Sequence, residues 1–193
     1  EAPSPRALAS YPLSPLQGGM LFHQLLDPQS GIDIEQVALS IAGGVDVERL
    51  RAAWQLVADR HDVLRTSFRE DGERPVQDVW PRADVPFGVE RCGDLTEPER
   101  EAAVEAALDA ERSGGLPLAR APLQRVRLLL FGDAAAAIWT FHHAILDGRA
   151  AQLVLCEILD AYAGRPLREP GPPFRAYVEA LERLDASASE PFW

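Results

Sequence analysis

Two adjacent histidines followed by an aspartate and a glycine form the pattern with the clearest chemical potential in this sequence. His142 and His143 lie in the run HHAILDG at 142–148. Imidazole titrates near neutral pH, so a histidine can shuttle a proton or hydrogen-bond a reacting amine. Asp147 is either a second acid–base group or the partner of an arginine. We favour the arginine partner, because a carboxylate beside Gly148 in a turn usually serves the backbone or an ion pair.

Motifs of several other reaction classes are absent from the sequence. It contains no GxSxG, P-loop or GxGxxG pattern. Two adjacent histidines and one aspartate are a poor ligand set for structural zinc. Cys92 and Cys156 also lack metal-ligand spacing, and Cys156 falls on the apolar side of an expected helix, which favours a core position. We therefore expect no directly bound metal or cofactor.

The histidine pair is expected at the end of a strand. The runs 123–131 and 136–143 are typical of two strands joined by a tight link at Gly132-Asp133. Consecutive strand residues point to opposite faces, so His142 and His143 face one substrate only if the strand ends between them. We expect one to face the core or orient the loop, and the other to face a cleft.

Helical and strand patterns alternate along the rest of the chain. A helix over 14–26 begins with a capping box of Ser14 and Gln17, which explains Gln17 better than a substrate role does. A helix over 149–163 ends at a Gly164 cap. Its expected buried face contains Leu153, Val154, Ile158 and Leu159. On the first helix, Leu16, Met20 and Leu21 fall on one apolar face, with Phe22 beside it.

The remaining elements indicate an α+β fold with a mixed, largely antiparallel sheet flanked by helices. Gly-, Asp- and Pro-containing turns separate them, and a Pro-rich connector is expected at 165–173. The expected strands cover 37–43, 64–69 and 76–80, and the expected helices cover 47–61, 97–113 and 174–184.

Composition limits the classes of partner. The chain has 193 residues, 47% of them hydrophobic, which suffices for one domain or large lobe with a core. A net charge of −11 disfavours nucleic acid and anionic membrane surfaces. No apolar run reaches the roughly 18 residues of a membrane span, and two unpatterned cysteines suit a reducing compartment. We expect a cytoplasmic protein.

Three motifs in order resemble those of nonribosomal peptide synthetase condensation domains. YPLSPLQGGMLFH at 11–23 is similar to the first, RHDVLRTSF at 60–68 to the second (RHxxLRTxF), and HHAILDG to the third (HHxxxDG). The segment 116–128 also resembles the family. The resemblance implies a chloramphenicol-acetyltransferase-like fold of two lobes. Residues 1–193 would be the N-terminal lobe, with 1–10 as a leader and the C-terminal lobe absent.

The resemblance also implies an activity. Family members are acyltransferases that join a donor thioester to an acceptor amine, and both substrates are carried on the phosphopantetheine of peptidyl carrier protein domains. The partners would be these carriers, the missing lobe and adjacent synthetase domains. The isolated lobe would be inactive.

The resemblance assigns roles to individual residues. His143 would be catalytic, either taking the amine proton or positioning the amine. His142 would be structural and Gly148 would permit a tight turn. Asp147 would pair with an arginine of the second motif, Arg60 being favoured over Arg65.

Two other functions share this fold and stay open. One is an epimerization domain in which His143 moves the α-proton, and the other is a non-catalytic lobe that recruits carrier proteins or enzymes. The opening motif leans toward members that follow an epimerised residue, or toward epimerases. The sequence also departs from the family after the glycine, where Arg149-Ala150 replaces a pair that usually ends in serine.

Overall fold

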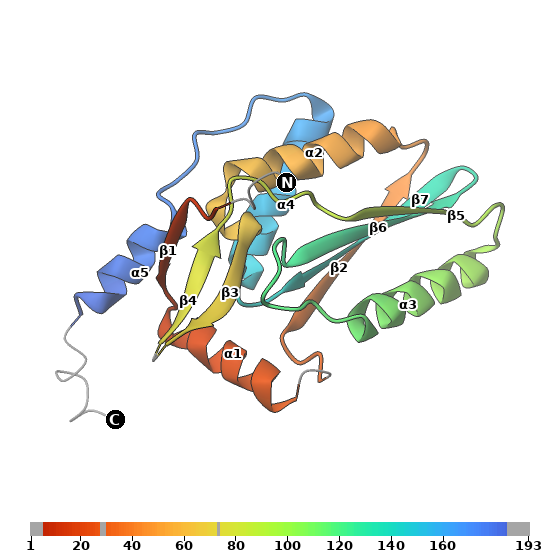
Figure 1. The fold of residues 1–193 in the computed structure, drawn as a ribbon. Helices are drawn as coiled ribbons and strands as arrows, with labels where there is room; N and C mark the ends of the chain where they lie inside the picture. Colours follow the sequence, from red (N-terminus) through yellow and green to blue (C-terminus); the bar gives the residue numbers. More distant parts are fainter. Residues whose placement is uncertain (1–5, 28–29, 73, 185–193) are drawn as a thin grey trace, which may run out of the picture.

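Two β-sheets with helices packed on them form the architecture of the chain (Figure 1). A computed structural model describes residues 6–27, 30–72 and 74–184, so 185–193, expected to begin a further element, lies outside the described residues. The smaller sheet is antiparallel and contains, in spatial order, β1 (Ala9–Pro12), β4 (Arg74–Val79) and β3 (Thr66–Asp71). The larger sheet contains β2 (Ile34–Ala42), β7 (Ala134–His142), β6 (Gln124–Phe131) and β5 (Phe87–Arg91).

The larger sheet is mixed but mainly antiparallel, as expected. β7 pairs antiparallel with β2 and β6, whereas β5 pairs parallel with β6. The helices are α1 (Pro15–Leu26), α2 (Val47–Arg60), α3 (Glu97–Ser113), α4 (Gly148–Ala163) and α5 (Phe174–Glu182), and a short 3₁₀ turn η1 (Asp62–Arg65) precedes β3. The α+β fold predicted from the sequence is confirmed.

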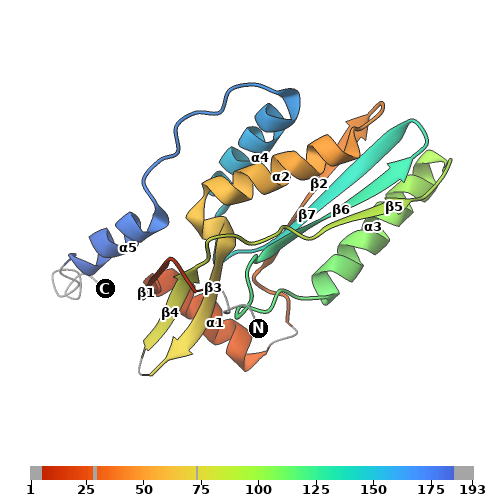
Figure 2. The same ribbon diagram turned by 45° about the horizontal axis from the view of Figure 1, so that its top comes forward.

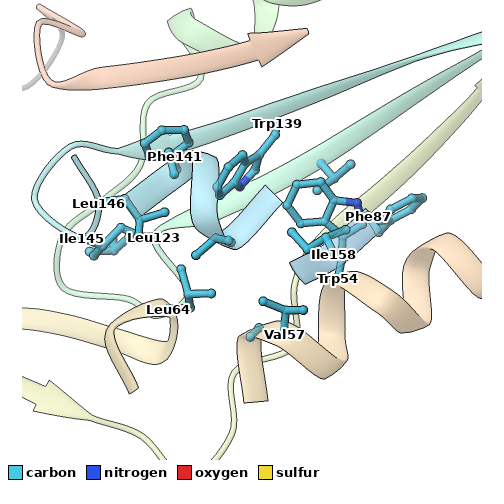
Figure 3. Close-up of a cluster of buried hydrophobic side chains, with 14 of the residues drawn as sticks. Trp54, Val57, Leu64, Phe87, Leu123, Trp139, Phe141, Ile145, Leu146 and Ile158 are labelled. Atoms are coloured by element: carbon cyan, nitrogen blue, oxygen red, sulfur yellow. The ribbon is translucent and has the colours of Figure 1, made fainter. Parts of the chain in front are cut away.

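Helices cover both faces of the larger sheet (Figure 2). α2 and α4 pack together on one face, and α3 lies across the other. The alternation of β7 explains this arrangement. Trp139 and Phe141 point to the side of α2 and α4, while Ala136 and Ile138 join the cluster under α3. Figure 3 shows the hydrophobic cluster on the side of α2 and α4, in which Trp139 packs against Trp54 of α2.

Local sequence signals explain most helix boundaries. Ser14 and Gln17 form the expected capping box at the start of α1, and Glu99 accepts a hydrogen bond from the backbone amide of Thr96 before α3. α4 ends at Gly164, whose φ of 72° is a left-handed conformation that glycine adopts without steric cost.

Several expected core positions are wrong. Leu16, on the expected apolar face of α1, and Leu153 and Leu159 on α4 are exposed, and so is Cys156. α4 contacts α2 and the sheet through a narrower stripe that contains Val154 and Ile158. The apolar residues beside that stripe therefore face outward.

The sequence patterns also missed β1 and β5. β1 begins at Ala9, within the range expected to be a leader, and pairs with β4. α5 packs near it, where Val178 is buried with Tyr11 and Val79. Both missed strands are short and depend on partners distant in sequence, so neither has a strong local signal.

No helix within the described residues is both long enough and apolar enough to cross a bilayer.

Candidate active site

β7 ends at His142, so the two histidines separate at the strand terminus. His142 has no exposed surface, whereas His143 is partly exposed in the loop before α4. The expectation that one histidine faces the core and the other a cleft is confirmed. The three residues that follow His143 anchor the loop in the core, because Ala144, Ile145 and Leu146 are all buried.

His142 is buried in the core and contacts the backbone of the following loop. Its Nδ1 accepts a hydrogen bond from the backbone amide of Ala144 at 3.1 Å. Burial lowers the pKa of His142 from its ordinary 6.5 to about 4, with the nearby Asp33 raising it and His143 lowering it. The imidazole is therefore neutral near pH 7 and acts as an acceptor that shapes the loop.

The buried His142 predicts a loss of stability in acid. The unfolded chain binds a proton more tightly than the folded chain between pH 6.5 and 4, so the free energy of unfolding falls as pH falls through this window. Between pH 7 and 4.5, the titration of His142 should lower the free energy of unfolding by about 2 kcal/mol. His142→Asn keeps an acceptor but not the titration. Urea unfolding should therefore show a flatter pH dependence for this variant, and equal slopes would contradict the assignment.

His143 is held in a defined tautomer. Its Nδ1 lies 2.8 Å from the carbonyl oxygen of Leu146. A carbonyl oxygen only accepts, so Nδ1 carries the proton of the neutral ring and Nε2 is left as the acceptor. The His143 backbone amide donates to the carbonyl oxygen of Asp33 at 2.8 Å. The ring can therefore accept a hydrogen bond or a proton at Nε2.

A pocket of about 440 Å³ adjoins His143, between β2 and α4. Its volume is in the range of small-ligand sites. Its walls combine apolar and polar side chains: Glu35, Gln36, Val37, Phe141, His143, Gly148, Ala151, Gln152 and Leu155. A larger pocket of about 560 Å³ between α3 and the ends of β2 and β7 contains no histidine. The pocket beside His143 is thus the better candidate for chemistry.

Asp147 does not pair with an arginine, which corrects the prediction. Its carboxylate accepts the backbone amide of Ala150 at 2.7 Å and caps α4. Arg60 lies 3.5 Å from Glu157 and donates to the carbonyl of Arg168. A helix N-terminus attracts a carboxylate, so Asp147 bonds the first turn of α4 instead of a distant arginine. The donor is the backbone amide of residue 150, which any residue except proline would provide.

Arg65, the alternative partner, is also occupied elsewhere. It pairs with Asp62 at 2.5 Å and donates to the carbonyl of Trp80. It therefore supports η1 and β4, away from the histidine loop.

Gly148 is not required by the backbone, contrary to the tight-turn prediction. Its φ is not positive, and it is the first residue of α4. A Cβ atom at this position would meet no heavy atom within 4 Å. Gly148 instead forms part of the pocket wall beside His143.

Two residues near the site escaped the sequence patterns. The sequence explains Gln17 by the helix cap alone, but its Nε2 also donates to the carbonyl of Ala144 at 2.9 Å. Gln77, on β4, hydrogen-bonds to Gln17 and has no exposed surface. The available signal was a glutamine within the expected strand 76–80, since such a side chain needs hydrogen-bond partners where the strand buries it.

Comparison with known proteins identifies relatives over almost the whole chain. The sequence model of the family "Condensation domain" matches residues 8–193. The chain is 40% identical to a linear gramicidin synthase polypeptide of Brevibacillus parabrevis and 34% identical to a mycosubtilin synthase polypeptide of Bacillus subtilis. Each alignment covers 95% of this chain, but only 2% and 7% of those relatives.

Solved structures share the fold. The starter condensation domain of rhizomide synthetase RzmA superposes with a TM-score of 0.80 at 23% identity, covering 96% of this chain and 49% of that one. The SgcC5 protein of Streptomyces globisporus gives 0.79 at 28% identity, covering 95% and 45%. The chain therefore spans about half the length of these structures.

Proposed function

The chain belongs to the condensation domain family of nonribosomal peptide synthetases, and from this premise we propose that it is the N-terminal lobe of a domain that forms an amide bond. The donor would be an aminoacyl or peptidyl thioester on one carrier protein, and the acceptor would be an amine on another. This proposal rests on the hydrogen bond from His143 Nδ1 to the Leu146 carbonyl, because in the neutral ring it makes Nε2 the acceptor atom of a histidine that lines a pocket.

The proposed reaction is aminolysis of a thioester. The acceptor nitrogen attacks the donor carbonyl carbon, the C–S bond breaks, and the proton lost by the amine balances the thiolate that leaves. Nε2 of His143 can accept a hydrogen bond from the amine, and either holds it in line or takes its proton. The neutral, buried His142 does not enter the reaction.

We propose that this lobe requires a second one. The chain spans about half the length of the condensation domain structures that it matches. The pocket beside His143 is lined by residues of β2, β7 and α4, and in this proposal the second lobe closes it and presents the carriers. The isolated 193-residue chain should accordingly show no turnover.

One experiment tests this function. The complete domain that contains this chain is mixed with donor- and acceptor-loaded carrier proteins in deuterated water, and products are followed by mass spectrometry. Amide product supports condensation. Deuterium at the α-carbon without amide would instead assign an epimerase, and carrier binding with neither reaction would assign a recruiting lobe.

The open space at Gly148 gives a prediction about the pocket. Gly148→Leu should place a side chain beside His143 and lower kcat/KM for the acceptor about tenfold or more, because a misplaced reactant loses much of its rate. The measurement is acceptor-dependent kinetics of the complete domain. Gly148→Ala is the control and should stay near the parent value. A leucine variant with unchanged kinetics would show that the acceptor does not use this pocket.

A further inference from the structure

A reciprocal amide pair joins the smaller sheet to the first helix. Gln77 Nε2 donates to Gln17 Oε1 at 3.0 Å, and Gln17 Nε2 donates to Gln77 Oε1 at 3.3 Å. The exposed fractions of the two residues are 0% and 4%. Burying two amides is costly unless their hydrogen bonds are made. The other bonds that this pair makes therefore show what it holds.

The pair has three further hydrogen bonds. Gln77 Nε2 donates to the carbonyl of Pro12 at 3.0 Å, and Gln17 Oε1 accepts from the amide of Ser14 at 2.9 Å. Gln17 Nε2 donates to the carbonyl of Ala144 at 2.9 Å. All four amide protons are thus used, and one of them reaches the histidine loop.

The bond to Ala144 acts on the residue that follows His143. The amide of Ala144 already donates to His142, and its carbonyl is held by Gln17. Both peptide groups that flank Ala144 are therefore fixed. Two residues later, the carbonyl of Leu146 accepts a hydrogen bond from Nδ1 of His143. Its position depends on the course of the chain through Ala144.

We propose that Gln17 and Gln77 are positioning residues that fix the tautomer of His143. Gln17 holds the Ala144 carbonyl, Gln77 holds Gln17, and the loop then presents the Leu146 carbonyl to Nδ1. Without this link, the loop shifts, the Nδ1 proton loses its acceptor, and the tautomer with Nε2 protonated becomes populated. The consequence for amide formation rests on the proposed function, whereas the consequence for the tautomer does not.

The test uses the complete condensation domain labelled with ¹⁵N in histidine, with the His143 signals assigned through His143→Ala. Nitrogen chemical shifts of neutral imidazole distinguish the two tautomers. The parent should show His143 with the proton on Nδ1. Gln17→Met should populate the Nε2–H form and lower kcat roughly 10- to 100-fold, with a smaller change in KM. Gln77→Met, which keeps the helix cap, should shift both readouts in the same direction.

Gln124→Met is the matched control, because Gln124 is equally buried and hydrogen-bonds Trp139 rather than the loop. It should lower stability but leave the His143 tautomer unchanged. If the Gln17→Met domain does not fold, the tautomer and kcat of the Gln77→Met domain test the inference. An unchanged tautomer in the folded variant, or the same shift in Gln124→Met, would overturn the inference. If the Gln17 and Gln77 variants shift the tautomer but the His143→Ala domain keeps its activity, the proposed function is overturned and the positioning role stands.

Discussion

Replacing His143 with alanine in the complete domain should lower the rate of amide formation about 100-fold or more. The expected size follows from the usual contribution of a positioned acid–base group. His143 is the partly exposed member of the histidine pair, and the hydrogen bond from Nδ1 to the Leu146 carbonyl makes Nε2 the acceptor atom of the neutral ring. Single-turnover formation of amide between two loaded carrier proteins measures the effect directly.

A second substitution separates the two roles of His143. Glutamine can place an acceptor oxygen near the position of Nε2 but cannot take a proton near neutral pH. If His143 only positions the amine, His143→Gln should recover most of the rate lost by the alanine variant. If it takes the proton, both variants should be equally slow.

His23→Ala serves as the control for loss of a histidine. His23 is half exposed on α1 and lies 3.5 Å from Asp33. Its removal should change the rate by no more than about twofold, as for an ordinary surface position. A His143→Ala domain with near-parental rate would remove the basis of the proposed mechanism.

The opposite placement of His142 and His143 was predictable because its signal is local. The alternation of a strand separates His142 from His143, and the structure confirms this at the end of β7. The capping box of Ser14 and Gln17 was likewise readable over four residues. Local geometry fixes such features, whatever the rest of the chain does.

The failures at the site mainly concern which partner each polar side chain contacts. Two arginines were candidate partners for Asp147, but its carboxylate accepts a hydrogen bond from the backbone amide of Ala150, three residues away. Arg60 instead forms an ion pair with Glu157 on α4. The bond from Gln17 to Ala144 spans 127 positions, and no short pattern encodes such a contact. Side-chain pairing of this kind follows from tertiary packing.

Trp139→Ala should lower the free energy of unfolding by about 4 kcal/mol, a typical cost for truncating a buried tryptophan. Trp139 has no exposed surface, and its ring lies 5.0 Å from that of Trp54 and 4.5 Å from that of Phe141. Its Nε1 donates to Gln124 at 2.9 Å, so truncation also leaves a buried amide oxygen without its donor.

The size of this loss matters because domains are stable by only about 5–15 kcal/mol. Trp139→Phe keeps an aromatic ring but not the bond to Gln124, so it should cost about 1–3 kcal/mol. Trp80→Ala is the control. Trp80 is partly exposed and bonds Ser67 outside this cluster, so its truncation should cost less than that of Trp139. Urea unfolding of the three variants checks the order.

Equal losses in the two alanine variants would show that the aromatic cluster is not the centre of the core. The expected order has a functional consequence, because β7 carries both Trp139 and the histidine pair. Trp139 packs β7 against α2, which joins α4 on that face of the sheet, and the pocket beside His143 lies between α4 and β2. Since α4 begins immediately after the histidine loop, we expect the loss of the Trp139 side chain to disturb this wall of the pocket as well as the core.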